Sequence, residues 1–332
     1  LGDVYKRQQL DQRIRALFPF ELTADQNKAV EDICHDLAGT EPMNRLLQGD
    51  VGSGKTVVAL YAALVAVGLH YQAAIMAPTE VLAEQHFQSM ERYLAHSRVK
   101  RLLLTGGLTG TRRRAVIEAM GQGEIDLVVG TQALLQEDVA FKNLALVIVD
   151  EQHKFGVHQR QRIRTKDQAC HYLVMTATPI PRTLAMTVYG DLDVSVIRHA
   201  PPGRGRVITK CYGPEKLPEA YEFIRSQVKQ GRQAYFVYPR LEESDNNAGT
   251  GEDANGYEPG ILKAAVAEQR RLQEQVFQEF KVGLLHGRMN GDEKLRVMVA
   301  FRAGDIHILV ATVVIEVGVD VPNATIMVIE HT

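Results

Sequence analysis

Gly49-Asp50-Val51-Gly52-Ser53-Gly54-Lys55-Thr56 fits the phosphate-binding pattern G-x-x-x-x-G-K-[ST] at every fixed position, and the fold class follows from it. Glycines in this pattern let the backbone curl until its N–H groups converge on phosphate oxygens, while the dipole of the next helix points its positive end at the same anion. Lys55 is expected to reach the outer phosphates and Thr56 to help hold Mg²⁺. The predicted nucleotide contacts of this stretch are Gly49, Gly52, Ser53, Gly54, Lys55 and Thr56.

The flanking sequence favours a nucleotide site over the alternative, a glycine-rich turn ahead of a helix. Residues 45–48 read as a short buried strand and residues 57–64 as an apolar helix, which is the strand, loop and helix that the pattern requires. The same unit recurs downstream, and its strands are apolar on both faces. We therefore predict an α/β fold with a parallel sheet covered by helices, and a binding edge where the strands end. Further strands with their following turns are expected at 72–79, 99–107, 125–131, 144–149 and 171–179.

Length and composition allow two domains of ordinary size. The 332 residues are 45% hydrophobic and carry a formal charge of −2, which excludes a globally basic coat for nucleic acid but permits local basic patches. The three cysteines, Cys34, Cys170 and Cys211, have neither zinc-binding nor disulfide spacing. No apolar run approaches about 18 residues, and no secretory signal is recognisable. We expect a cytoplasmic monomer without a membrane partner.

A change in composition marks the expected domain boundary. Residues 198–206 are rich in Pro, Gly and Arg, as linkers are, and the alternation of strands and helices resumes beyond them. We predict a leader at 1–17, a first domain at 18–197, the linker at 198–206, and a second, incomplete domain at 207–332. The first eight residues match nothing that follows, and we expect them to be foreign to the protein.

Asp150 and Glu151 are the candidate catalytic acids. They follow the apolar strand at 144–149, where paired carboxylates are costly unless they face an ion or a reacting water. Asp150 is placed to bind Mg²⁺, and Glu151 to orient or deprotonate the water that attacks the terminal phosphate. With Lys55 they form the predicted catalytic set.

Four further polar residues have a functional and a structural interpretation. Gln26, on the first turn of a helix capped by Thr23, has the two-way amide needed to read adenine, although a surface glutamine is the commoner case. His153 could link the acids to their surroundings or be an ordinary structural histidine. Thr176 and Thr178 could bond the acidic loop and a neighbouring domain, or simply end a strand.

At this point the sequence resembles the superfamily-2 helicases and, within them, the bacterial RecG branch-migration helicases. The resemblance runs from about residue 18 to the end. It rests on the phosphate loop and on matching stretches at 22–26, 76–86, 150–157, 176–183, 189–197, 285–289 and 315–322.

The resemblance implies two tandem RecA-like domains, the second one truncated, that form an ATP-driven motor on DNA and remodel forks and Holliday junctions in recombination and repair. ATP and Mg²⁺ are the implied cofactors, and branched DNA is the implied partner. Gly318 and Asp320 would sense the nucleotide. The residues implied along the DNA are Pro78, Thr79, Thr105, Gly106, Gly130, Thr131, Tyr238, Pro239 and Thr312. Basic runs at 112–114 and at 160, 162 and 164 could add electrostatic grip or be solvated helix faces.

The sequence also departs from the family pattern. It stops before the last helicase motif, whose arginines reach the ATP site, so we expect it to bind ATP but hydrolyse it poorly. It starts without the N-terminal wedge domain that recognises branched DNA in the family. Two alternatives stay open: a translocase of the transcription-repair coupling type, and a nucleotide-dependent switch that does not translocate.

Overall fold

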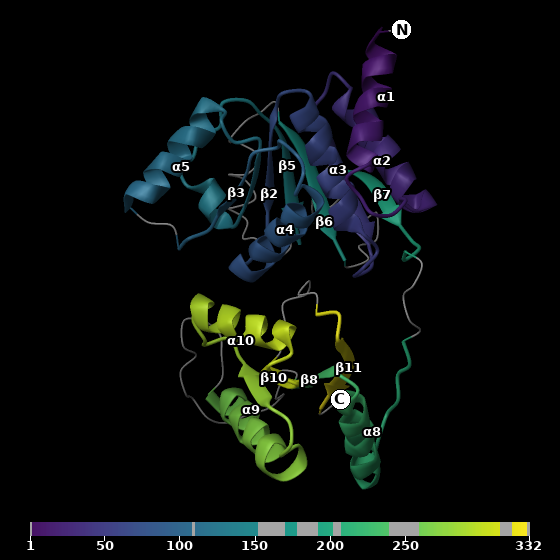
Figure 1. Ribbon diagram of the computed structural model, residues 1–332, viewed down its shortest axis with the longest axis vertical. Helices are drawn as coiled ribbons and strands as arrows, with labels where there is room; N and C mark the ends of the chain where they lie inside the picture. Colours follow the sequence, from purple (N-terminus) through teal and green to yellow (C-terminus); the bar gives the residue numbers. More distant parts are fainter. Residues whose placement is uncertain are drawn as a thin grey trace, which may run out of the picture. The chain divides into compact units, whose positions relative to one another are not determined.

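The computed structural model of the chain describes residues 2–107, 110–151, 170–177, 192–201, 207–238, 259–312 and 321–330. By its internal contacts the chain divides into two compact units, Leu1–Arg206 and Val207–Thr332. Each unit holds one sheet in which all described strand pairs are parallel (Figure 1). The predicted α/β class with two tandem parallel-sheet domains is confirmed, and the second unit is the smaller of the two.

In the described part of the first unit the sheet has seven strands, in the order β3-β4-β2-β5-β6-β1-β7. Its strands are β1 (Asn44–Gly49), β2 (Gln72–Met76), β3 (Arg101–Leu104), β4 (Leu127–Gly130), β5 (Leu144–Asp150), β6 (His171–Thr176) and β7 (Asp193–Ile197). Because β6 lies between β5 and β1, the end of the acidic strand and the phosphate loop are separated by a single strand.

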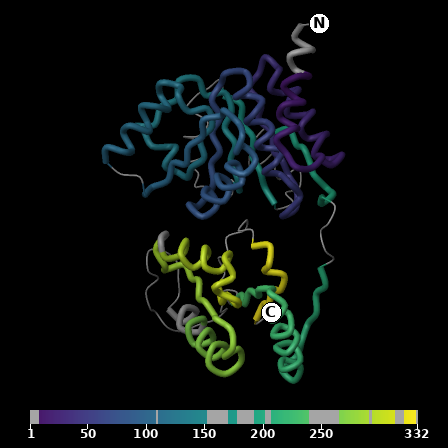
Figure 2. Tube along the Cα trace, in the orientation of Figure 1, coloured from purple at the N-terminus to yellow at the C-terminus, as the bar shows by residue number. Residues whose placement is uncertain are grey.

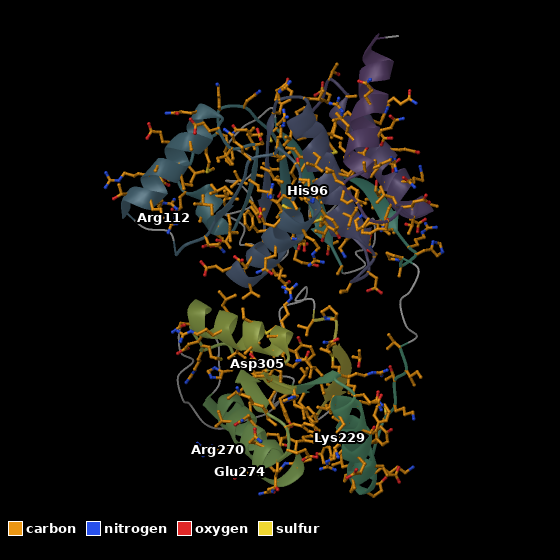
Figure 3. All side chains as sticks on the ribbon, viewed as in Figure 1. His96, Arg112, Lys229, Arg270, Glu274 and Asp305 are labelled. Carbon is orange, nitrogen blue, oxygen red and sulfur yellow. The ribbon has the colours of Figure 1, made fainter. Side chains whose placement is uncertain are left out.

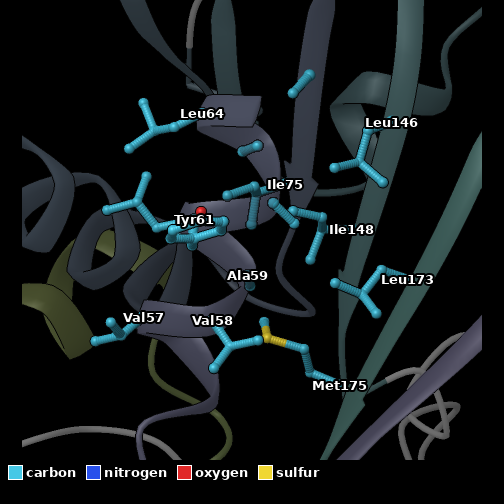
Figure 4. Packing of buried hydrophobic residues seen from close by; sticks show 14 of the residues in the cluster. Val57, Val58, Ala59, Tyr61, Leu64, Ile75, Leu146, Ile148, Leu173 and Met175 are labelled. Atoms are coloured by element: carbon cyan, nitrogen blue, oxygen red, sulfur yellow. The ribbon is translucent and has the colours of Figure 1, made fainter. Parts of the chain in front are cut away.

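Helices cover both faces of this sheet. Figure 2 traces the chain of this unit from α1 to β7. The elements are α1 (Gly2–Arg15), α2 (Ala24–Leu37), α3 (Lys55–Gly68), α4 (Glu80–Tyr93), α5 (Gly110–Gln122) and the 3₁₀ turn η1 (Gln132–Leu135). One core packs α1 to α4 on the sheet, and a second core packs α5 and η1 on the other face. Helix α3 is apolar nearly all round, as a helix buried in a core must be, and its Val58 and Tyr61 pack with Ile75 and Met175 (Figure 4).

The described residues of the second unit form four strands in the order β11-β8-β10-β9. Its elements are η3 (Pro214–Lys216), α8 (Leu217–Lys229), β8 (Gln233–Tyr238), α9 (Pro259–Arg271), the π-helical turn η4 (Leu272–Val276), β9 (Val282–Leu285), α10 (Gly291–Ala303), β10 (Ile308–Thr312) and β11 (Ala324–Ile329). Phe236 and Phe277 fill the core beneath α8 and η4, whereas Phe301 fills the core beneath α10.

Helix α1 and strand β7 were not expected from the sequence. Helix α1 is polar overall, so its sequence has no apolar stripe that would predict a helix. Its Ile14 is nevertheless buried, and Leu10 packs on the same core. Its Asp11 carboxylate accepts a hydrogen bond from the hydroxyl of Tyr61 on α3. Among the described strands β7 pairs with β1, which lies nearly 150 residues earlier in the sequence, and local pattern cannot report such a pairing.

Candidate active site

The phosphate loop joins β1 to α3, and its glycines are required by geometry. Gly52 and Gly54 have φ of 75° and 90°, in the left-handed region that other residues rarely adopt. A Cβ on Gly54 would lie 2.2 Å from Nε2 of Gln26, and one on Gly49 would lie 2.5 Å from Oγ of Ser53. The loop therefore accepts only glycine at these positions without rearrangement.

The start of α3 is open to an anion. Its N-cap, Gly54, has no side-chain cap bond, and the first turn holds no acidic residue. The hydroxyl of Ser53 is buried and finds no hydrogen-bond partner among the described residues. A buried hydroxyl without a partner is costly, and a phosphate oxygen would satisfy it. The loop thus has the features of a phosphate cradle.

Lys55 opens α3 and folds back over the loop. Its Nζ donates to the carbonyl oxygens of Gly49 at 2.6 Å and Asp50 at 3.0 Å. Burial lowers the pKa of Lys55, and the negative charges of Asp150, Glu151 and Asp50 oppose that shift. The lysine therefore lies within electrostatic reach of both predicted catalytic acids.

Gln26 connects α2 to the phosphate loop. Its backbone N–H bonds to the hydroxyl of Thr23, and its Oε1 accepts the Thr23 N–H at 2.9 Å, so the two residues form a capping box. Its Nε2 donates to the carbonyl of Ser53 at 2.8 Å. Both ends of the amide are thus bonded within the protein, and its predicted reading of adenine stays a prediction.

The acid pair lies at the end of β5. Glu151 is buried, and its φ of 49° puts it in the left-handed region, a strained conformation for a residue with a side chain. The neighbouring strand β6 holds it: its N–H donates to the Met175 carbonyl at 2.9 Å, and its carboxylate accepts from the Ala177 N–H at 3.0 Å and the Thr176 hydroxyl at 3.4 Å. Backbone strain sustained by neighbours in this way is typical of functional sites.

His86 is a member of this site that sequence reasoning missed. Its Nε2 lies 2.8 Å from Oδ2 of Asp150, and both side chains are largely buried. The residue belongs to the stretch at 76–86 that carries the resemblance, but spacing alone gave it no role. The available signal was a histidine on the buried stripe of a helix, together with Leu82, Ala83 and Met90.

The loop ends predicted to follow DNA lie along one part of the same edge, after β2, β3 and β4. Thr79 caps α4 by accepting the Leu82 N–H, and the N–H of Gly106, next to Thr105, donates to the Glu80 carboxylate at 3.0 Å. Thr131 is buried after β4. Gly130 has no room for a side chain, because a Cβ would lie 2.4 Å from the Leu104 carbonyl oxygen. Pro78 precedes Thr79 at the end of β2.

The second unit contributes two described candidates, and both are buried. Tyr238 ends β8 inside the core, and burial with the nearby carboxylate of Glu268 raises its pKa. Thr312 ends β10, and its hydroxyl has no hydrogen-bond partner among the described residues. The other predicted site residues lie outside the described residues; they are His153, Thr178, Pro239, Gly318 and Asp320.

The basic runs differ in what can be said of them. Arg112 and Arg114 are exposed on α5, where Figure 3 labels Arg112. Arg113, between them, is bonded to Asp138 and Gln136. The run at 160, 162 and 164 lies outside the described residues.

Within the described ranges, no group of three or more His, Cys, Asp or Glu could hold a metal ion. Mg²⁺ usually takes one or two protein oxygens and fills its shell with phosphates and water. Thr56 at the start of α3 and Asp150 at the end of β5 can supply such oxygens. No helix in the described part is both long and apolar enough to cross a bilayer.

Comparison with known proteins finds matches along most of the chain. Residues 23–187 match the DEAD/DEAH box helicases, and residues 262–332 match the helicase conserved C-terminal domain. The chain is 48% identical over 323 residues to the ATP-dependent DNA helicase RecG of Synechocystis sp. (strain ATCC 27184 / PCC 6803 / Kazusa), covering 97% of this chain and 37% of that protein. It is 46% identical over 325 residues to RecG of Bacillus subtilis (strain 168), covering 98% and 46%. The chain thus spans less than half the length of these relatives.

Solved structures agree with the sequence matches. The chain superposes on RecG bound to a three-way DNA junction with a TM-score of 0.77 and 42% identity, over 96% of this chain and 40% of that one. The DEAD-box helicase Mss116 bound to single-stranded RNA gives a TM-score of 0.65 at 19% identity, which is a likeness of fold alone.

Proposed function

Because the chain belongs to the RecG family of ATP-dependent DNA helicases, of which it is a partial helicase region, we propose that it binds and hydrolyses ATP as part of a motor on branched DNA. One observation carries the proposal. The strained, buried Glu151 is held by β6, and β6 is the strand that pairs with β1 at the phosphate loop. A carboxylate held at this place can orient a water toward a bound terminal phosphate.

ATP is held by the phosphate loop in this proposal. The uncapped start of α3 and the hydroxyl of Ser53 receive phosphate oxygens, and Lys55 exchanges its two loop carbonyls for the outer phosphates. Gln26 keeps the loop in shape through Ser53. From the second unit, Gly318 and Asp320 would sense the nucleotide.

Mg²⁺ would be held by Thr56 and Asp150, with the phosphates completing its shell. When bound, it supplies charge that stabilises the transferring phosphoryl group. Glu151 orients the attacking water and takes its proton. His153, Thr176 and Thr178 would connect this chemistry with DNA binding, and the bond from Thr176 to Glu151 supports that role for one of the three.

DNA would run along the loop ends after β2, β3 and β4, with Tyr238, Pro239 and Thr312 contributed by the second unit. Loop-end backbone groups and hydroxyls grip phosphates without reading bases, which suits a motor that must pass any sequence. Since Tyr238 is buried, its contribution would come from the backbone. Branched substrates are proposed because the similar solved RecG is bound to a three-way junction. A motor on chromosomal DNA is expected to act as a monomer in the bacterial cytoplasm.

The alternatives are weaker. The curated relatives reported above are RecG helicases, which favours this family over the transcription-repair coupling factor. A nucleotide switch needs only one α/β unit, whereas the chain has two.

ATP hydrolysis with forked, linear and no DNA tests the proposal, using the whole protein that contains these 332 residues. We expect forked DNA to stimulate hydrolysis, Lys55→Ala to weaken ATP binding, and Glu151→Gln to bind ATP normally while losing turnover by a factor of about 10² to 10⁴. Hydrolysis that ignores DNA would contradict the motor, and normal turnover in Glu151→Gln would contradict the catalytic assignment. The slow hydrolysis expected of the 332 residues alone stays a prediction, which the same assay on the chain measures.

A further inference from the structure

The contact between His86 and Asp150 joins two parts of the sheet edge that the proposed function uses differently. His86 lies on α4, which follows β2, and Asp150 ends β5. Strands β2 and β5 are neighbours in the sheet. On one side of this pair of strands lie the ends of β4 and β3, with the proposed DNA loops, and on the other lie β6 and β1, with the catalytic loop and phosphate loop. The contact therefore sits at the boundary between the two sets of loops.

The chemistry of the two side chains fixes how His86 and Asp150 bond to each other. A carboxylate oxygen accepts hydrogen bonds, so in the 2.8 Å contact the Nε2–H of His86 is the donor and Oδ2 of Asp150 is the acceptor. His86 lies on the stripe of α4 that faces the core, where a polar ring is costly unless it is bonded. Packing in the core thus holds the imidazole ring of His86, and the ring in turn holds the carboxylate of Asp150. Because this bond fixes Oδ2 of Asp150, it also sets the direction in which Oδ1 points.

Helix α4 links this bond to the loop before it. Thr79 caps the first turn of α4, and His86 lies seven residues later, two helical turns along one face. Over that length an α-helix moves nearly as a rigid rod, so a displacement of the Pro78-Thr79 loop would reach the Asp150 carboxylate through a single element.

We propose that His86 is a positioning residue: it orients Asp150 toward phosphate-bound Mg²⁺ and ties that carboxylate to the helix that begins at the Thr79 loop. The inference rests on the proposed nucleotide site and adds a residue to it. Partners of metal ligands that fix their orientation commonly change metal affinity by 10- to 100-fold when they are removed.

The test measures binding and does not depend on turnover. The affinity of the 332-residue chain for a non-hydrolysable ATP analogue is measured with Mg²⁺ and again with EDTA, and the ratio of the two affinities reports the metal's contribution. We expect His86→Ala to reduce this ratio about tenfold while the EDTA affinity is unchanged. His86→Gln keeps an N–H donor at similar reach and should restore most of the ratio. Asp150→Ala should bring the ratio close to one, because the metal then no longer adds to the affinity. The double variant with Asp150→Ala and His86→Ala should have the same ratio as Asp150→Ala.

The matched control is His96→Ala, because His96 is an exposed histidine just beyond the same helix (Figure 3). It should behave as the unaltered chain. If His86→Ala keeps the ratio while Asp150→Ala loses it, His86 does not position the ligand, although the proposed site stands. If His86→Ala lowers both affinities together with the melting temperature and His86→Gln does not rescue the ratio, the role is structural and the inference fails. If Asp150→Ala keeps the ratio, the metal assignment of the proposed function fails with it.

Discussion

The sheets of the two units share a four-strand frame. In the first unit β3, β4, β2 and β5 lie in that order, and in the second β9, β10, β8 and β11 do the same. The frames agree in detail: β5 and β11 both carry a register irregularity against their partner strand at the same place, after Leu144 and after Ala324. Helices α5 and α10 precede equivalent strands in the two frames.

A buried glutamine locks each frame. Gln72 begins β2, and its Nε2 donates to the carbonyls of Met120 at 3.0 Å and Ile125 at 2.7 Å. Gln233 begins β8, and its Nε2 donates to the carbonyls of Phe301 and Ile306, which have the same spacing. Each glutamine thus ties the end of a helix to the start of the next strand.

The difference lies beyond this frame. In the first unit β6, β1 and β7 continue the sheet past β5, whereas no strand in the described part of the second unit lies beyond β11. Asp150 lies seven residues after Asn143, and Glu330 lies seven residues after Asn323, whose carbonyls receive the N–H groups of the two locking glutamines. Both frames therefore end in an acid, and in the first unit the residue after Asp150, Glu151, is held in a strained conformation by the adjoining strand β6. In the first unit, the strand next to β5 therefore positions the residue proposed as the catalytic acid.

The largest expected effect comes from removing a lock. Gln72→Ala leaves two carbonyls and the N–H groups of Lys142 and Asn143 without their bonds, so we expect the free energy of unfolding of the first unit to fall by about 3 kcal/mol. Gln233→Ala breaks fewer described bonds and should cost the second unit about 2 kcal/mol. Urea unfolding measures the loss, and amide hydrogen exchange assigns it to a unit.

Gln122→Ala, at an exposed glutamine that ends α5, is the control and should cost less than about 0.5 kcal/mol. If Gln233→Ala lowers the free energy of unfolding of the first unit as much as that of the second, each glutamine does not stabilise its own frame alone, and this would contradict the equivalence of the two frames.

The next effect separates the nucleotide edge from the shared frame. Gly54→Ala adds a Cβ at a φ of 90° and against the buried Gln26, so we expect ATP affinity to fall about 30-fold, or about 2 kcal/mol. Gly304 of the second unit has a φ of 87°, but a Cβ there meets nothing within 4 Å. Gly304→Ala should therefore cost about 1 kcal/mol of stability and leave ATP affinity unchanged. Calorimetric titration with ATP checks both, and equal losses of affinity would show that the effect of Gly54→Ala does not arise at the nucleotide edge.

Sequence patterns predicted what each segment does by itself. The phosphate loop, the strands and the acid pair follow from local spacing, and the fold class follows from their alternation. The bond from Gln26 to Ser53 spans 27 residues and the bond from His86 to Asp150 spans 64. Such bonds depend on which strands become neighbours, and periodicity reports only which face of one element is apolar.

The same limit explains the remaining surprises. From the sequence, Glu151 is a second acid after a strand, and no local pattern indicates its left-handed backbone. That conformation is held by β6, whose Thr176 lies 25 residues further along the chain. The resemblance implies that Tyr238 lies along DNA, but the core under α8 buries its side chain. Gln72 and Gln233 look like ordinary polar strand starts until the strand order brings the two carbonyls to each of them.

A smaller effect is the pH dependence of ATP binding. Burial lowers the pKa of Lys55 in the free chain, and bound phosphate would raise it again. Affinity should be flat below the free-state pKa and should fall as pH rises through it, by at most tenfold per pH unit, or about 1.4 kcal/mol. The fall should begin below pH 10.5, where an ordinary lysine titrates. Titrations between pH 7.5 and 10 measure it, and Lys55→Arg, whose charge persists, should show no such fall. A slope shared by both chains would place the titrating group elsewhere.

The smallest effect concerns acid stability in the two units. Burial lowers the pKa of His171, although the Asp36 charge opposes the shift, and its Nδ1 accepts the Met43 N–H at 3.0 Å. A histidine with a lower pKa in the folded state binds its proton more readily when unfolded. The first unit should therefore lose stability as pH falls below about 6.5, until the folded-state pKa is reached. Burial also lowers the pKa of His286 in the second unit, and the charge of Lys294 adds to the shift.

Unfolding at pH 7.5 and 5.5 should show a smaller loss of stability in acid for His171→Gln, whose amide oxygen can still accept the N–H of Met43. Added salt should reduce the contribution of His286, because it screens Lys294. An acid loss that neither His171→Gln nor added salt changes would mean that carboxylates, and not these histidines, set the stability of both units below neutral pH.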